Sequence, residues 1–235
     1  MSQNQVLPQV IFFDAVGTLF GIKGSVGDIY SQVAQKHGVI VSPSVLNKAF
    51  GKTFIQAPPL AFNQLDFITL PQKEYEWWYQ IVKSTFQQVN VLDEFTNFDL
   101  FFQELYVYFT TKKPWYIYPD VFDCLQKWQQ KKVELGIISN FDTRIYQVLK
   151  ILKLEPYFSS ITISSEAGFA KPHPKIFQKA LEKHKTQPEK AWHIGDSLKE
   201  DYEAANEVKI KAFFLERDKL KLQVKNQLPN LNSLG

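Results

Sequence analysis

The first regular pattern in the chain is a run of four apolar residues, 10–13, that ends directly at a carboxylate, Asp14. A short run that is apolar at every position is typical of a strand buried on both faces in the middle of a parallel sheet. Ligands of open α/β sheets bind beyond the carboxyl ends of the strands, so Asp14 is predicted to point into such a crevice. An aspartate there is either a nucleophile that forms an aspartyl phosphate or an ordinary cap at the end of a strand.

Between about residues 22 and 116 the apolar residues recur every three or four positions instead, which predicts helices. Helices are expected over residues 25–37, with Ser25 or Asp28 as the cap at the start, and over residues 43–57, 71–89 and 93–110. This insertion is rich in aromatic side chains. We expect the rings mainly to pack against one another, because a small helical unit needs large side chains to bury enough area. Lining a substrate pocket is the alternative role.

Strands and helices alternate again after residue 116. Strands are expected at residues 133–138, 161–163, 191–194 and 212–215, and helices at 120–131, 143–152, 174–184 and 199–206. This alternation indicates a parallel sheet covered by helices on both sides. The predicted fold class is therefore α/β: residues 1–21 and 117–235 form a Rossmann-like, doubly wound core domain, and residues 22–116 form an inserted, all-helical cap domain. The tail after residue 216 has only scattered leucines and predicts no further element.

Composition and charge exclude several classes of protein. Hydrophobic residues make up 45% and charged residues 22% of the chain, which are ordinary values for a globular protein. The net charge of +3 is too small to indicate binding to nucleic acid or to an anionic membrane. No apolar run is long enough to span a bilayer, and the N-terminal segment lacks the features of a signal peptide. We therefore expect a cytoplasmic protein, whose oligomeric state the sequence leaves open.

The single cysteine, Cys124, cannot form a disulfide within the chain. It lies in step with Val121, Leu125 and Trp128 on one predicted helical face, so we expect a buried structural thiol rather than a reactive one.

Polar residues that could take part in catalysis or binding lie at the predicted strand ends or in the loops beside them. They are Asp14, Ser139, Asn140, Lys171, Asp196 and Asp201. A parallel topology brings these ends to one edge of the sheet, although each residue alone has an ordinary explanation as a cap or a solvated charge. Together they suit phosphoryl transfer. Carboxylates hold Mg²⁺, a lysine supplies a second positive charge, and a serine hydroxyl holds a phosphate oxygen.

In their order along the chain these residues resemble the motifs of the haloacid dehalogenase superfamily of hydrolases, in members with a helical cap between the first two motifs. The first motif there usually reads Asp-x-Asp-Gly-Thr; here residues 14–18 read Asp-Ala-Val-Gly-Thr, as in a subgroup with valine at the third position. The later motifs match Ser139, Lys171 before Pro172, and Gly195-Asp196-Ser197 followed by Asp201. Together they cover residues 9–215.

The resemblance implies a role for each matching residue. Asp14 is expected to be the nucleophile and a metal ligand, with Ser139 and Lys171 as further catalytic residues. The implied metal site for Mg²⁺ consists of Asp14, the backbone carbonyl of Val16, Asp196 and, in support, Asp201. The implied substrate-binding residues are Thr18, Ser139, Asn140 and Lys171. The cap is expected to close over the site and select the substrate.

Val16 departs from the usual motif, which has at this position the aspartate that acts as general acid and base. A valine cannot protonate a leaving oxygen or activate water, and loss of such catalysis typically costs 10²–10⁴-fold in rate. The implied metal and catalytic residues predict a Mg²⁺-dependent hydrolase, most simply a phosphoric monoester hydrolase. Val16 predicts that its activity is reduced. The hydrolase is expected to act on a small phosphorylated metabolite through an aspartyl phosphate.

Three alternatives stay open. A non-catalytic protein would keep the metal- and phosphate-binding groups without turnover, for which Val16 is the main argument. A dehalogenase would share the nucleophile without a metal; the acidic pair Asp196 and Asp201 argues against it. Phosphonate cleavage would need a Schiff-base lysine from the cap, for which Lys23 and Lys52 are nominal candidates.

Overall fold

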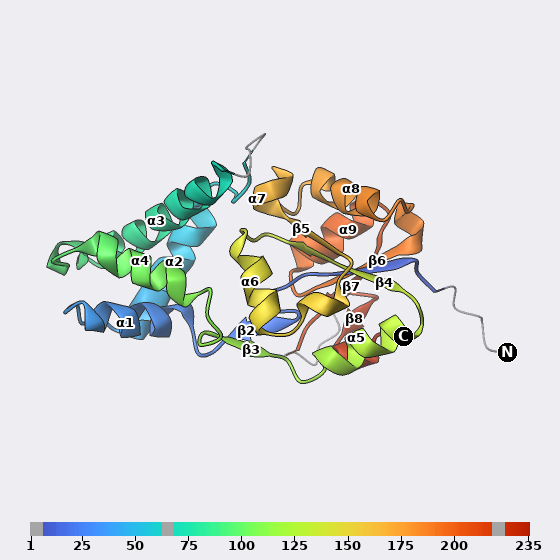
Figure 1. Ribbon diagram of the computed structural model, residues 1–235, viewed down its shortest axis with the longest axis horizontal. Coiled ribbons are helices and arrows are strands. Elements are labelled where there is room, and N and C mark those ends of the chain that lie inside the picture. The colour runs from blue at the N-terminus through green and yellow to red at the C-terminus, as the bar shows by residue number, and fades with distance from the viewer. Residues whose placement is uncertain (1–6, 63–67, 218–223) are drawn as a thin grey trace.

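The computed structural model describes residues 7–62, 68–217 and 224–235. The first six residues, which belong to the segment without signal-peptide features, lie outside the described residues. Within the described ranges no helix combines the length and the apolar character that a membrane crossing requires. Figure 1 shows a central sheet with helices around it and a group of helices to one side.

The central sheet has six parallel strands in the order β5-β4-β1-β6-β7-β8. They are β1 (Val10–Phe13), β4 (Glu134–Ser139), β5 (Ser160–Ile163), β6 (Ala191–Gly195), β7 (Lys211–Leu215) and β8 (Gln227–Leu228). This confirms the predicted α/β fold class with a parallel sheet. β1 lies between β4 and β6, so the residue after β1 is flanked by the carboxyl ends of both neighbours.

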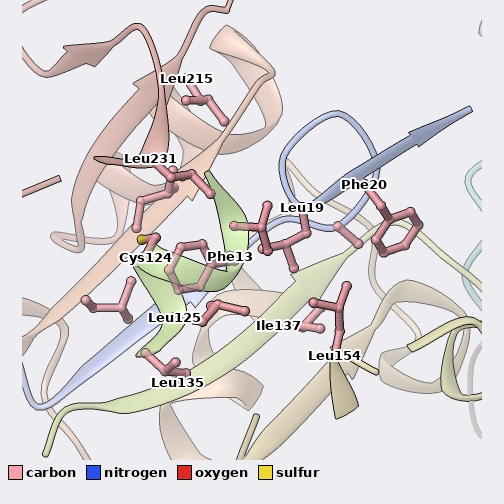
Figure 2. Packing of buried hydrophobic residues seen from close by; sticks show 14 of the residues in the cluster. Phe13, Leu19, Phe20, Cys124, Leu125, Leu135, Ile137, Leu154, Leu215 and Leu231 are labelled. Atoms are coloured by element: carbon pink, nitrogen blue, oxygen red, sulfur yellow. The ribbon is translucent and has the colours of Figure 1, made fainter. Parts of the chain in front are cut away.

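Helices cover both faces of the sheet. Ile11 and Phe13 pack on the face covered by α5 (Val121–Gln130) and α6 (Arg144–Ile151). The alternate residues Val10 and Phe12 pack on the other face, against α8 (Pro174–Lys183) and α9 (Ala204–Glu207), with α7 (Ser164–Ala167) contributing Ala167. Every residue of β1 is thus buried, which is why its sequence is apolar throughout. Figure 2 shows the first of these clusters, in which Cys124 is a buried packing residue as predicted.

The helical insertion contains α1 (Val26–Lys36), α2 (Pro43–Gln56), α3 (Leu70–Gln88) and α4 (Phe98–Tyr108). It is connected to the sheet by two short antiparallel strands, β2 (Phe20–Ile22) and β3 (Trp115–Ile117), which the sequence pattern did not predict. Figure 1 shows the four helices gathered beside the sheet, with β2 and β3 leading to them.

Aromatic rings form much of the interior of this helical unit. Phe86 lies 5.1 Å from Phe101 and Tyr75 lies 4.8 Å from Phe102, measured between ring centroids. The rings therefore mainly pack together, as expected. The predicted start of the fourth helix at residue 93 was wrong, because the side chain of Asn97 caps the helix by accepting a hydrogen bond from the Leu100 amide at 3.0 Å.

The C-terminal tail also contributes structure that the sequence did not predict. Asp120, just before α5, accepts hydrogen bonds from Arg217 Nη1 at 2.8 and 3.0 Å and from the Leu231 amide at 2.6 Å. Arg217 also donates through Nη2 to the Thr18 carbonyl at 2.9 Å. Thr18 belongs to the loop that follows β1, so the tail steadies that loop.

We expect Asp120→Asn to lower the free energy of unfolding by about 2 kcal/mol, because a buried carboxylate loses its charge opposite a guanidinium. Urea denaturation measures this. Asp123→Asn, the same change at an exposed position in the first turn of α5, is the matched control and should have little effect. Equal stabilities of the two variants would show that the tail does not depend on Asp120.

Candidate active site

The sheet topology brings the predicted catalytic residues together at the carboxyl ends of β1 and β4. Asp14 follows β1 and Ser139 ends β4, and the Ser139 hydroxyl donates to Asp14 Oδ1 at 3.1 Å. Lys171, from the loop between α7 and α8, donates through Nζ to the same oxygen at 2.7 Å. Lys171 is only 4% exposed. A carboxylate is therefore fixed between a hydroxyl and a buried ammonium group.

Asn140 holds the lysine loop against β4. Its Oδ1 accepts from the Lys171 backbone amide at 2.7 Å, and its Nδ2 donates to the Lys171 carbonyl at 2.9 Å. Nδ2 also lies 3.2 Å from Glu200 Oε2. Both polar atoms of Asn140 are thus used by protein groups, so this side chain positions Lys171 as well as bordering the site.

Two glycines make room for the acidic residues that follow β6. Gly17 has φ +92°, and a Cβ on it would lie 2.2 Å from Asp196 Oδ2. A Cβ on Gly195 would lie 2.1 Å from Asp201 Cγ. The glycines at both places are required because carboxylates pack directly against the backbone.

Three carboxylates meet near the single ammonium of Lys171. Asp14, Asp196 and Asp201 each offer one oxygen such that all three atoms lie within 4.8 Å of one another. Burial raises the pKa of Asp14, and Lys171 offsets this only in part. Asp196 opens onto solvent, yet desolvation by the surrounding protein and repulsion from Asp14 and Asp201 raise the pKa of its carboxyl to about 7. The donor set is hard, oxygen-only and short of positive charge, which fits Mg²⁺.

The Lys171 side chain bridges two carboxylates. Besides Asp14, its Nζ donates to Asp201 Oδ1 at 2.5 Å. Burial favours the neutral amine, but Asp14 and Asp201 outweigh it and raise the pKa of Lys171, so the group stays an ammonium ion. Burial also opposes ionisation of Asp201, but Lys171 and His193 outweigh it and hold its pKa well below the usual range.

His193 and Glu200 belong to this cluster but were not identified from the sequence. His193 Nε2 lies 2.8 Å from Asp201 Oδ1, from inside β6. Glu200, beside Asn140, follows Ser197 in a π-helical turn, Leu198–Glu203. One signal was available for His193: it is the only ionisable residue in an otherwise apolar strand.

The segment after Asn140 contacts the helical insertion. Asp142 is buried, pairs with Arg144, and accepts a hydrogen bond from Trp78 Nε1 of α3 at 2.6 Å. Glu74, also on α3, accepts hydrogen bonds from the Thr143 amide at 3.0 Å and from the Thr143 hydroxyl. The insertion is therefore hydrogen-bonded to the segment that directly follows the Ser139 end of β4. These contacts had no signal in the sequence.

Other predicted site residues lie apart from these contacts. The Thr18 side chain is 0% exposed, and its hydroxyl has no hydrogen-bond partner in the described part of the chain. The side chain of Val16 is half-buried and packs against the apolar cluster beneath the site. Lys23 and Lys52 are exposed, on the loop after β2 and in α2 respectively.

Comparisons with known proteins agree with this arrangement. Residues 8–209 match the model of a family described as haloacid dehalogenase-like hydrolase. Haloacid dehalogenase-like hydrolase domain-containing protein 3 of Xenopus laevis is 31% identical over 207 residues, which are 88% of this chain and 84% of that protein.

Two solved structures share the fold. The putative HAD-hydrolase YfnB from Bacillus subtilis, bound to magnesium, has a TM-score of 0.75 at 16% identity over 97% of both chains. The 2-haloacid dehalogenase from Pseudomonas syringae pv. Tomato has a TM-score of 0.65 at 19% identity over 97% of this chain and 96% of that one. The fold, the ordered motifs and the match over most of the sequence lead to one conclusion: the chain belongs to the haloacid dehalogenase-like hydrolase family.

Proposed function

We propose that this protein is a Mg²⁺-dependent hydrolase of small phosphate monoesters that works through an aspartyl phosphate on Asp14. The observation that carries the proposal is the environment of this carboxylate, which the Ser139 hydroxyl and the Lys171 ammonium group contact on one oxygen. A phosphate ester brings negative charge to a negative nucleophile, so positive groups at this position are required. The insertion, residues 22–116, acts as a cap domain that selects the substrate.

The residues suggest a two-step reaction. An oxygen of Asp14 attacks phosphorus, a bond to phosphorus forms, and the bond to the leaving oxygen breaks. The leaving oxygen takes its proton from solvent, because Val16 has none to give. Water then attacks the phosphorus, inorganic phosphate leaves, and the Asp14 carboxylate is restored. Ser139 and Lys171 hold the oxygens of the transferring group throughout.

Asp14, Asp196 and the Val16 carbonyl are the residues that would hold Mg²⁺. When bound, the ion supplies the positive charge that these carboxylates lack and that the phosphoryl oxygens require. We expect Asp196→Asn to weaken Mg²⁺ binding by at least about tenfold, because one anionic ligand becomes neutral. Isothermal titration calorimetry measures this, with Asp123→Asn as the control. An unchanged Mg²⁺ affinity in Asp196→Asn would show that the ion does not bind there.

A dehalogenase shares this fold, so the residues must distinguish the two activities. Three clustered carboxylates repel an anionic haloacid unless a cation is bound, which favours the phosphatase. The deciding experiment is a screen of aryl, acyl and sugar phosphates with and without Mg²⁺, alongside a 2-haloacid without metal. Mg²⁺-dependent phosphate release supports the proposal. Halide release without metal, or binding of phosphate and Mg²⁺ without turnover, contradicts it.

A further inference from the structure

His193 is an unusual residue at its position in the sheet. It lies in the middle of β6, paired with Phe12 of β1 and Ala212 of β7, and is 0% exposed. Its ring meets Phe177 edge to face at 5.4 Å. An apolar side chain would satisfy these surroundings, whereas burying an imidazole costs free energy unless it is hydrogen-bonded. The histidine therefore needs an explanation other than packing.

Only one of the two ring nitrogens of His193 has a hydrogen-bond partner among the described residues. Nε2 lies 2.8 Å from Asp201 Oδ1, while Nδ1 has no partner in the part of the chain that the structure describes. A carboxylate can only accept a hydrogen bond, so Nε2 carries the proton and donates it. The ring thus leaves one nitrogen unsatisfied and directs the other at Asp201.

Asp201 is in turn held by protein donors on both of its oxygens. Oδ1 accepts from His193 and from Lys171 Nζ, and Oδ2 accepts from the Ser197 amide at 3.1 Å. Its side chain lies against Gly195, where any Cβ would collide with it. The position of Asp201 sets the position of Lys171, because the ammonium group bridges Asp201 and Asp14.

We propose that His193 is a positioning residue: it holds Asp201 so that Lys171 is aligned on the Asp14 nucleophile. This rests on the proposed function of Asp14. Without the Nε2–H donor, Asp201 keeps the Lys171 and Ser197 donors but loses the one that holds Oδ1 from β6, so its carboxylate is held less firmly. The position of Lys171, which Asp201 helps to set, is then less closely fixed on Asp14.

The test compares two variants of equal size in the full-length protein. His193→Gln retains an N–H donor near the Nε2 position, and His193→Met has similar length and volume but no donor. We expect the methionine variant to lose about 10–100-fold in kcat towards an aryl phosphate with Mg²⁺, as removal of outer hydrogen-bond partners typically does. Its KM and its Tm should change little, and the glutamine variant should recover most of kcat.

His184 supplies a control for the loss of a buried histidine. It contacts Ser160 and also Glu134. Glu134 is the first residue of β4, at the opposite end of that strand from Ser139. His184→Met should lower the Tm and leave kcat as in the wild type. If the role of His193 were purely structural, His193→Met would likewise lower the Tm and leave kcat as in the wild type.

A second readout does not need turnover. Beryllium fluoride with Mg²⁺ mimics a phosphoryl group on an aspartate, so its binding, measured as a rise in Tm, also depends on the alignment of Lys171. The methionine variant should bind it more weakly than the glutamine variant. If the wild type binds this mimic but releases no phosphate, the proposed hydrolase function fails while the role of His193 is still decided.

The inference is overturned if folded His193→Met keeps wild-type kcat and wild-type beryllium fluoride binding, or if His193→Gln loses as much as His193→Met. Should the methionine variant not fold, His193→Asn replaces it, because its amide is one methylene too short to reach Asp201. If the wild type neither hydrolyses the aryl phosphate nor binds beryllium fluoride, both proposals are overturned.

Discussion

Asp14→Asn is expected to reduce turnover of an activated aryl phosphate by about 10⁴-fold or more. An amide is a poor nucleophile, and the remaining groups around it only bind the substrate. The variant should keep its fold, because asparagine has the same shape and Lys171 retains its contact with Asp201. Steady-state release of the aryl alcohol measures the loss, and near-ultraviolet circular dichroism checks the fold.

The same variant separates nucleophilic catalysis from simple binding. In the wild type, rapid quenching with acid should trap a phosphoryl group on the peptide that carries Asp14. The asparagine variant should show no trapped phosphoryl group even at a saturating concentration of Mg²⁺, which is needed because the change also removes one of the proposed anionic ligands. If Asp14→Asn retains activity within tenfold of the wild type, another residue is the nucleophile and the proposed reaction is wrong.

Val16→Asp is expected to raise the hydrolysis of alkyl phosphates by about 10²-fold. Alkyl oxygens are poor leaving groups, so they depend most on a proton that the wild type lacks. Val16 is half-buried, and a carboxylate there would be only two residues along the chain from Asp14, the proposed nucleophile. Aryl and acyl phosphates, whose leaving oxygens need little protonation, should gain less in the first step.

Val16→Asn is the matched control, because it has the size and polarity of aspartate without an acidic proton. It should give no gain. Hydrolysis of the aspartyl phosphate should also accelerate in Val16→Asp, since the same carboxylate would activate water. Rapid-quench measurement of the phosphoenzyme burst separates the two steps. Fast turnover of alkyl phosphates by the wild type would mean that a different residue already supplies the proton.

The local pattern of the sequence determined the parts of the fold whose causes are local. Four apolar residues before Asp14 predicted a strand buried on both faces. The structure confirms this, since helices cover both faces of β1. Ser25 was one of two residues expected to start the first helix, and the structure has it there with a capping box to Asp28. Signals of this kind act within one helical turn or one strand, so they are readable without knowledge of the rest of the chain.

Elements that depend on distant partners were missed or misplaced. The strands β2 and β3 have three residues each and exist only because they pair across the whole helical insertion. β8 has two residues and is ordered by pairing with β7. Strands this short have no clear periodicity in the sequence. They are stabilised by pairing with strands that are distant in the chain, which a local pattern does not reveal.

The candidate site divides in the same way. By itself the sequence determined which residue types end the strands and in what order, and so placed Asp14, Ser139, Lys171 and the acidic pair at one edge. Only the tertiary structure decided how they contact one another, because Lys171 and Asp14 are 157 residues apart and meet through the strand order. It also decided that Asp201 faces Lys171 and His193, and that Glu74 reaches Thr143. Hydrogen bonds depend on the direction and distance of individual atoms, and those are set by packing across the whole fold rather than by any local pattern.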